Sequence, residues 1–248
     1  MGSNPDDIAE NKDRLRSIEH WLIRPSEKVK PNALFLQQET NNLNELLSRK
    51  EWSQDYTRSL ELQQIRATFH ADQAREAAIR HYQSSGTKPN VAVMAETIAC
   101  VHALHAMADS IAQIINAFVL EESERLSEDK VSFWPIMEKL KAQMPNSQLD
   151  DAVGKLKKSS KFEYIVAFCN KIKHRSLVNY GQGLTIDVSG IPAEHDVQFT
   201  NFEYDGKPCP RLWAREIFLD YRSEIFRLVA EVIKEVSALI SDPQNPPE

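Results

Sequence analysis

The chain has 248 residues, 42% hydrophobic and 27% charged, so it can bury a core and is not a disordered protein. Its net charge of −6 argues against nonspecific coating of nucleic acid, because that binding depends on many contacts between basic side chains and phosphates. Only 7 glycines, and 12 prolines mostly near the ends of the expected elements, favour helices over a sandwich or a barrel.

Three scattered cysteines, Cys100, Cys169 and Cys209, form neither a Cys-x-x-Cys pair nor an even set for disulfides. This pattern is typical of proteins in a reducing compartment. The beginning of the chain is polar and acidic and has no apolar stretch typical of a signal peptide. We therefore expect a cytoplasmic protein.

Helices dominate the predicted elements. After a polar segment up to Arg24, the stretch 33–82 has no proline or glycine and carries apolar residues at helical spacing, which predicts one kinked helix or two abutting helices. A long apolar central helix is expected at 91–120. Further helices are predicted at 135–143, 148–158, 161–178 and 211–240.

The central helix is long enough to suggest a membrane span. Its window 97–120, however, contains two histidines, an aspartate, a glutamine and an asparagine, which a lipid-facing helix rarely tolerates. We interpret it as the central helix of a soluble bundle and expect no membrane partner.

The pattern changes between Tyr180 and Pro210, where apolar and polar residues alternate with period two, as in a β-hairpin or a small meander. The predicted fold class is therefore all-α, an up-and-down helical bundle with a small β-hairpin inserted before the last helix. The predicted organisation is an N-terminal helical segment at 1–88, a bundle at 89–242 with the hairpin near 183–205, and a frayed tail at 243–248.

A polar face runs along the central helix. At 100° per residue, its members project to one side, opposite a row of apolar residues. They are His102, His105, Asp109, Gln113 and Asn116. Exposed helix faces usually carry many lysines, glutamates and arginines, whereas this face has a single charge, so we predict a semi-buried polar seam.

A second group of polar residues lies on the helix predicted at 161–178. Its members are Asn170, Lys171, Lys173, His174 and Arg175. Lys173 projects near the apolar stripe of its helix, so its ammonium must extend to solvent or find a carboxylate. We predict that this helix packs on the central helix, with Asp109 in reach of Lys173, His174 or Arg175.

The segment "CNKIKH", residues 169–174, resembles the motif of the HEPN superfamily, in which arginine, a polar residue, three free positions and histidine follow one another on a late helix. Asn170 takes the polar place and His174 the histidine place, but Cys169 stands in the arginine place. The resemblance covers about residues 90 to 240. It implies an all-α bundle, a homodimer, and either a noncatalytic module or an RNase that needs no metal or other cofactor.

In catalytic family members, histidine and arginine of two protomers meet at a dimer interface, so the resemblance implies that His174 and Asn170 are the candidate catalytic residues. The histidine can relay the proton of a 2′-hydroxyl, and the arginine stabilises the phosphorane. Cys169 cannot supply that charge. Lys171, Lys173 and Arg175 remain as candidate phosphate contacts, with the polar face of the central helix as the other wall of the binding site.

Simpler interpretations stay open for these residues. His174 near a helix C-terminus is also explained by a favourable interaction with the helix dipole. The spacing of Arg14–His20 and Arg75–His81 is of a kind that arises by chance at this composition. Cys100 projects away from His102 on their helix, so these two and His105 cannot converge, and no metal site is expected.

Three functions follow from these patterns. The first is a noncatalytic HEPN-like module that binds RNA, a nucleotide or a protein partner in a bacterial defence or stress system. The second is an active, metal-independent ribonuclease that uses His174. The third is a structural adaptor whose polar seam fixes the packing of the helices.

Overall fold

The computed structural model describes residues 29–48, 54–83, 91–174, 178–186 and 192–241. The predicted N-terminal polar segment and the predicted tail lie outside these residues. The described part is mostly helical, as the composition predicts. Its longer helices are α3 (Lys30–Leu47), α4 (Gln54–Gln83), α5 (Val91–Phe118), α6 (Phe133–Gln143), α7 (Gln148–Lys158), α8 (Ser160–His174) and α10 (Arg222–Ser241).

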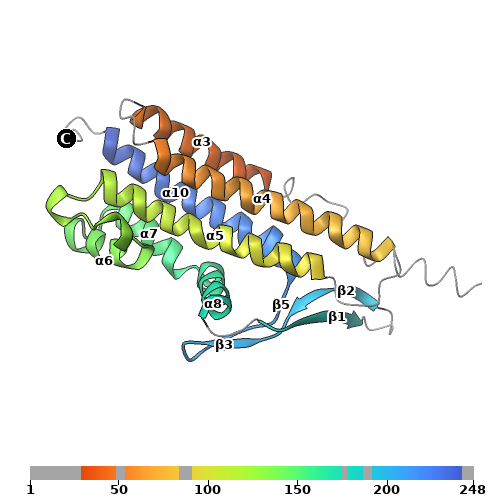
Figure 1. Ribbon diagram of the computed structural model, residues 1–248. Coiled ribbons are helices and arrows are strands. Elements are labelled where there is room, and N and C mark those ends of the chain that lie inside the picture. The colour runs from red at the N-terminus through yellow and green to blue at the C-terminus, as the bar shows by residue number, and fades with distance from the viewer. Residues whose placement is uncertain (1–28, 49–53, 84–90, 175–177, 187–191, 242–248) are drawn as a thin grey trace, which may run out of the picture.

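Four long helices, α3, α4, α5 and α10, lie side by side and form the main layer of the fold (Figure 1). The shorter helices α6, α7 and α8 cover α5 and α10 from one side, and the strands lie beside α8 (Figure 1). The proline- and glycine-free stretch 33–82 thus forms two helices, one of the two arrangements that the sequence allows.

The central helix α5 provides much of the core. Leu104, Met107, Ile111 and Ile114 are completely buried, and α5 contacts α4, α6, α8 and α10. By length and composition alone, α5 is also the described helix that could cross a membrane. Its contacts with four other helices are those of a core helix, which passes the same test of length and composition.

Side chains close in the sequence stabilise both ends of helix α7. The Ser147 Oγ accepts a hydrogen bond from the backbone N–H of Asp150 at 3.1 Å, as an N-cap does. Lys155, Lys157 and Lys158 lie in the last turn, where positive charge is favourable with the helix dipole.

The β region is larger than the predicted hairpin. Strand β1 (Tyr180–Ile186) pairs antiparallel with β2 (Pro192–Phe199), and β2 also pairs with the short β5 (Leu212–Trp213). A separate hairpin joins β3 (Phe202–Tyr204) to β4 (Lys207–Cys209).

The turn of this hairpin is Asp205-Gly206, where both residues have positive φ, 54° and 72°, as a tight two-residue turn requires. The closing helix was predicted from 211, but Leu212 and Trp213 are extended. Their backbone pairs with β2, so pairing across the chain overrides the helical pattern of the sequence at this point.

A π-helical turn connects the short helix α9 (Ala214–Glu216) to α10. This turn, η4, spans Ile217–Tyr221, and Arg222 follows it. Arg222 is completely buried, and its Nη1 donates a hydrogen bond of 3.4 Å to the carbonyl of Ala67 on α4. Its Nε and Nη2 have no hydrogen-bond partner among the described residues.

Candidate functional site

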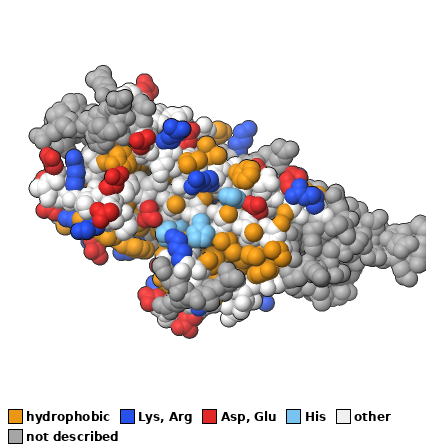
Figure 2. Space-filling model, in the orientation of Figure 1, with side chains coloured by type: hydrophobic (Ala, Val, Ile, Leu, Met, Phe, Trp, Pro, Cys, Tyr) orange, Lys and Arg blue, Asp and Glu red, His pale blue; other side chains and the backbone are white. Residues whose placement is uncertain are grey.

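Helix α8 packs against α5, as the sequence predicts. Where they meet, four polar side chains come together, which we call the histidine cluster: His102 and His105 from α5, and Cys169 and Lys173 from α8. Figure 2 shows histidine and basic side chains beside one another in the middle of this face, where α5 passes α8 in Figure 1. Hydrophobic side chains gather beside them in this view.

The first contact of the cluster joins Cys169 to His102. The Sγ of Cys169 lies 3.4 Å from the Nδ1 of His102, and the cysteine is completely buried. Burial raises the pKa of the Cys169 thiol, and the positive charge of Lys173 opposes this shift. The thiol is therefore neutral near pH 7, and it lies in the interface between the helices rather than on the surface.

Both histidines of the cluster are half-buried. Burial lowers the pKa of His102, and the charge of Lys173 lowers it further. Burial is also the main cause that lowers the pKa of His105; Asp109 acts in the opposite direction, and Lys173 and His102 add to the lowering. Both imidazoles are therefore mainly neutral near pH 7 and gain protons only when negative charge arrives or the pH falls.

Lys173 extends to solvent, one of the two outcomes that its place on the apolar stripe allows. Among the described side chains, no ion pair joins Lys173 to Asp109, and the predicted alternatives with His174 and Arg175 lie outside the described residues. Instead, the Oδ1 of Asp109 accepts a hydrogen bond from the backbone N–H of Phe133 at 3.2 Å, and its Oδ2 lies 3.8 Å from the Nδ1 of His105. The carboxylate thus holds the start of α6, a partner that the helical pattern of α5 cannot indicate.

The rest of the polar face on α5 binds the chain that connects α5 to α6. The side chain of Asn116 donates to the carbonyl of Leu126 at 3.0 Å and accepts from its N–H at 2.8 Å. The Nε2 of Gln113 donates to the carbonyl of Glu128 at 3.4 Å. The predicted semi-buried seam is confirmed, and Asp109, Gln113 and Asn116 satisfy backbone groups of residues 126–133.

The remaining predicted residues of α8 diverge. The Nζ of Lys171 donates to the carbonyl of Glu203 in β3 at 3.4 Å, so this lysine ties α8 to the hairpin. Asn170 is half-buried. His174 is the last residue of α8, but its side chain, like the whole of Arg175, lies outside the described residues.

The three residues considered for a metal point to different neighbours. The Sγ of Cys100 lies 3.6 Å from the carbonyl of Ala67 on α4, whereas His102 faces Cys169 on α8 and His105 faces Asp109. They do not converge, as the sequence predicts. Arg75, one of the two arginines paired with a histidine by spacing, contacts Glu76 at 2.6 Å; the side chain of His81 and the pair Arg14–His20 lie outside the described residues.

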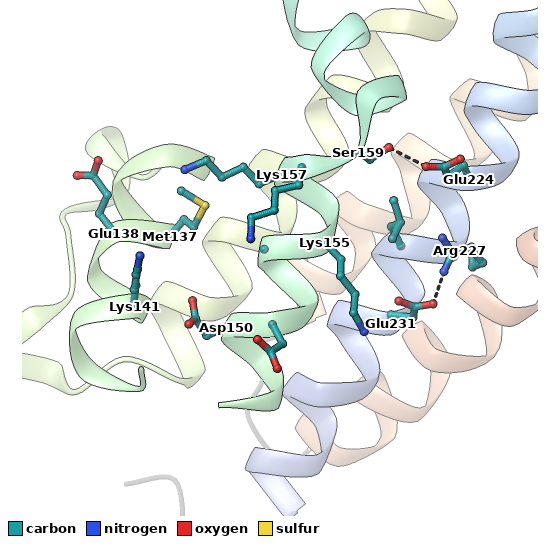
Figure 3. Close-up of a pocket in the computed structure, with 14 residues that line it drawn as sticks. Met137, Glu138, Lys141, Asp150, Lys155, Lys157, Ser159, Glu224, Arg227 and Glu231 are labelled. Atoms are coloured by element: carbon teal, nitrogen blue, oxygen red, sulfur yellow. Dashed lines mark hydrogen bonds and ion pairs between the residues drawn. The ribbon is translucent and has the colours of Figure 1, made fainter. Parts of the chain in front are cut away.

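Two other grooves have different charge properties. One of about 570 Å³ lies between α4 and α5 and is lined by Asp55, Asp109 and Glu128, so it does not suit an anion. The other, of about 970 Å³, lies between α6, α7 and α10 (Figure 3). Figure 3 shows basic and acidic side chains from all three helices around it, with Arg227 paired to Glu231. Its charges are mixed, unlike those of a nucleic-acid interface.

Two buried residues with unusual surroundings were not singled out from the sequence. Arg222 has a sequence signal: Phe218, Arg222 and Phe226 follow at i, i+4 and i+8, so the arginine lies on an apolar stripe. Tyr164, whose hydroxyl is unpaired among the described residues, has none, because the groove above it is formed by segments distant in the sequence.

Comparison with known proteins assigns no family to the chain. A scan against protein-family models, a search of curated proteins and a search of solved structures each found no match. The HEPN-like interpretation therefore depends on the motif residues and stays a prediction.

Proposed function

We propose that the protein is a noncatalytic, HEPN-like helical module that binds RNA or a nucleotide through phosphate groups at the histidine cluster. One observation carries the proposal: Lys173 is exposed, forms no ion pair with a carboxylate among the described residues, and lies beside two mainly neutral histidines. An arriving phosphate pairs with this ammonium and stabilises protons on His102 and His105.

The position of Cys169 supports binding without catalysis. Cleavage of RNA needs a positive donor that stabilises the charge developing on the phosphorane. The neutral, buried thiol cannot supply it, and Lys173 offers an ammonium that lacks the planar fork of arginine. Loss of one preorganised donor lowers a rate by about 10²- to 10³-fold, so we expect weak or no cleavage.

The setting that we propose is a bacterial defence or stress system in the cytoplasm, with the protein as a homodimer. The HEPN resemblance suggests both the defence or stress setting and the homodimer. A stripe of exposed apolar side chains on α4, formed by Leu62, Ile65 and Phe69 at helical spacing, is a surface that suits a second copy. These three side chains are 42%, 56% and 55% exposed.

The test is the binding of labelled single-stranded RNA, measured by fluorescence anisotropy at about 50 and 200 mM salt. The variant Lys173→Ala removes the proposed phosphate contact, and Lys234→Ala, an exposed lysine of α10, is the matched control. At the lower salt we expect Lys173→Ala to weaken binding about fivefold and to reduce the salt slope by about 0.7, the value for one contact with a single strand. A labelled nucleotide, titrated in parallel, separates the two ligands.

Failure of the unmodified protein to bind RNA or nucleotide at the lower salt contradicts the proposal. The same samples, run on a denaturing gel, report cleavage. Robust cleavage that is lost in His174→Ala and does not need added metal supports the ribonuclease instead.

A second candidate is the structural adaptor, favoured by the bonds of Asp109 and Asn116 to backbone groups. These residues hold the 126–133 segment rather than a ligand. If neither RNA nor nucleotide binds while Asn116→Ala lowers stability, the adaptor becomes the better interpretation.

A further inference from the structure

A groove of about 500 Å³ lies between α8, the β3–β4 hairpin and the π-helical turn. It shares no residue with the histidine cluster. Its walls come from five elements and are mainly aromatic or apolar: Trp134 of α6, Tyr164 of α8, Tyr204 of β3, Pro208 and Cys209 of β4, and Tyr221 of the π-helical turn. Its volume lies in the usual range of small-molecule sites.

Tyr164 forms a rigid part of this groove. Its ring packs edge to face on Tyr221, with centroids 5.5 Å apart, and on Phe202 at 5.6 Å. A third ring, Phe168, lies at 6.1 Å. Because neighbours on several sides fix the ring, the surface that it presents is preorganised for a ligand.

The hydroxyl of Tyr164 is unusual for a buried polar group. The residue is only 4% exposed, yet its hydroxyl has no hydrogen-bond partner among the described residues. Burial is the main cause that raises the pKa of the Tyr164 hydroxyl, and the neighbouring Tyr221 and Cys209 raise it further. The group therefore stays a neutral O–H donor. Tyr164 lines the groove together with Tyr221 and Cys209, and its hydroxyl is shielded from solvent. Buried hydroxyls are normally paired, and an unpaired one at a groove suggests a ligand acceptor.

The rim argues against an anion. The Nζ of Lys207 lies 3.8 Å from the Oε1 of Glu163, and Asp205 adds a second carboxylate. Among the side chains that line the groove, an anionic ligand would therefore meet two carboxylates and one ammonium that is already paired.

Two aromatic walls argue against a cation. The Nζ of Lys157 lies 5.4 Å from the ring centroid of Trp134, and the Nζ of Lys161 lies 5.8 Å from that of Tyr221. Because these rings already hold ammonium groups of the protein, a cationic ligand would meet like charge. A neutral ligand remains.

We propose that this groove binds a small, uncharged, planar aromatic molecule with a hydrogen-bond acceptor, which packs against Trp134 and Tyr204 and accepts a hydrogen bond from Tyr164. Aromatic rings favour offset or edge-to-face packing with another ring, which such a ligand supplies. This site is independent of the proposed RNA or nucleotide binding.

The experiment uses coumarin, a neutral bicyclic ring with a carbonyl acceptor, as the probe, and measures its affinity for the full chain by saturation-transfer NMR. Naphthalene has similar size without an acceptor, and benzoate and trimethylphenylammonium are charged comparisons. The variants are Tyr164→Phe, which removes one oxygen atom, and Tyr204→Ala, which removes a wall. Tyr180→Phe on β1 is the matched control, because Tyr180 does not line the groove.

We expect coumarin to bind more tightly than either charged probe. Tyr164→Phe should weaken coumarin about five- to tenfold, the usual effect of one hydrogen bond, and leave naphthalene unchanged. Without ligand, its Tm should equal or exceed that of the unmodified protein, because an unpaired buried hydroxyl is removed. Tyr204→Ala should weaken both neutral probes.

Three results overturn the proposal. They are no detectable coumarin binding by the unmodified protein, coumarin binding that neither variant changes, and binding of a proline-rich peptide to this groove with no binding of coumarin. The last result would instead fit the aromatic grooves that recognise extended proline-rich segments.

Discussion

The buried arginine after the π-helical turn gives the sharpest prediction about stability. Arg222 is completely buried, and two of its three side-chain nitrogens have no hydrogen-bond partner among the described residues. Burial is the main cause that lowers its pKa, whereas the charges of Cys100 and Asp72 act in the opposite direction. Burial also raises the pKa of the Cys100 thiol to about 12, so this thiol is neutral near pH 7. The guanidinium is therefore poorly compensated.

The substitution Arg222→Met replaces this group with a flexible apolar side chain. Each unpaired buried polar group costs about 1–3 kcal/mol, so removal of two gains about 2–6 kcal/mol. Against this, the variant loses the long hydrogen bond to Ala67, worth about 1–3 kcal/mol for a charged donor, and a contact with Phe226 worth about 0.5–2 kcal/mol. The midpoints of these gains and losses differ by about 1 kcal/mol, so we expect the free energy of unfolding to rise by about 1 kcal/mol, at the lower end of the range found when buried ions are replaced by apolar groups.

The assay is urea denaturation at pH 7, followed by circular dichroism. Arg222→Ala, which leaves a cavity, should instead lower the free energy of unfolding by about 2–4 kcal/mol. Arg227→Met, at an exposed position of α10, should change it by less than about 0.5 kcal/mol. If Arg222→Met lowers stability by more than about 1 kcal/mol, then Asp72 and Ala67 compensate the guanidinium, and the reasoning is refuted.

Three further predictions concern the site and the dimer. The pKa values of His102 and His105 are lowered in the folded state, so the unfolded chain binds more protons below about pH 6.5. The free energy of unfolding, measured by urea titration, should therefore fall between pH 7 and 5. Replacement of both histidines by glutamine should make this fall smaller. Asn116→Ala should lower stability by about 2–4 kcal/mol, since it leaves two backbone groups unpaired, and the exposed Asn201→Ala should not. Ile65→Asp should reduce the mass measured by light scattering to that of a monomer without lowering Tm, and a monomeric unmodified protein would contradict the proposed dimer.

Elements set by local chemistry could be predicted from the sequence. Helix α7 has the predicted bounds, because Ser147 caps its start. Helix α5 begins at the predicted residue and ends two residues before the predicted end, since no glycine or proline interrupts its apolar pattern. In both cases the signal lies within one short segment.

Features that depend on distant segments could not be predicted. The helical wheel places Asp109 on a polar face but does not indicate which segment covers that face, so its bond to Phe133 was missed. The strand at Leu212–Trp213 forms only because β2 lies beside it. The π-helical turn shifts the register of the closing helix, and the pattern of apolar residues does not indicate such a shift.

Under the proposed function, the arrangement of α8 favours phosphate binding over catalysis. Cys169 and Lys173 are four residues apart and project to the same side of the helix, but the first lies in the interface with α5 and the second reaches solvent. An arginine at position 169 would have to displace the contact between Cys169 and His102. Its guanidinium would also be buried there without a paired carboxylate among the described residues. Among the described residues of the histidine cluster, the exposed positive charge therefore comes from Lys173. Its ammonium can bind a phosphate as a point charge but cannot form the bidentate pair that an arginine can. Affinity for phosphate should thus follow Lys173 and the protonation of the two histidines, whereas turnover would need a donor that the cluster does not contain.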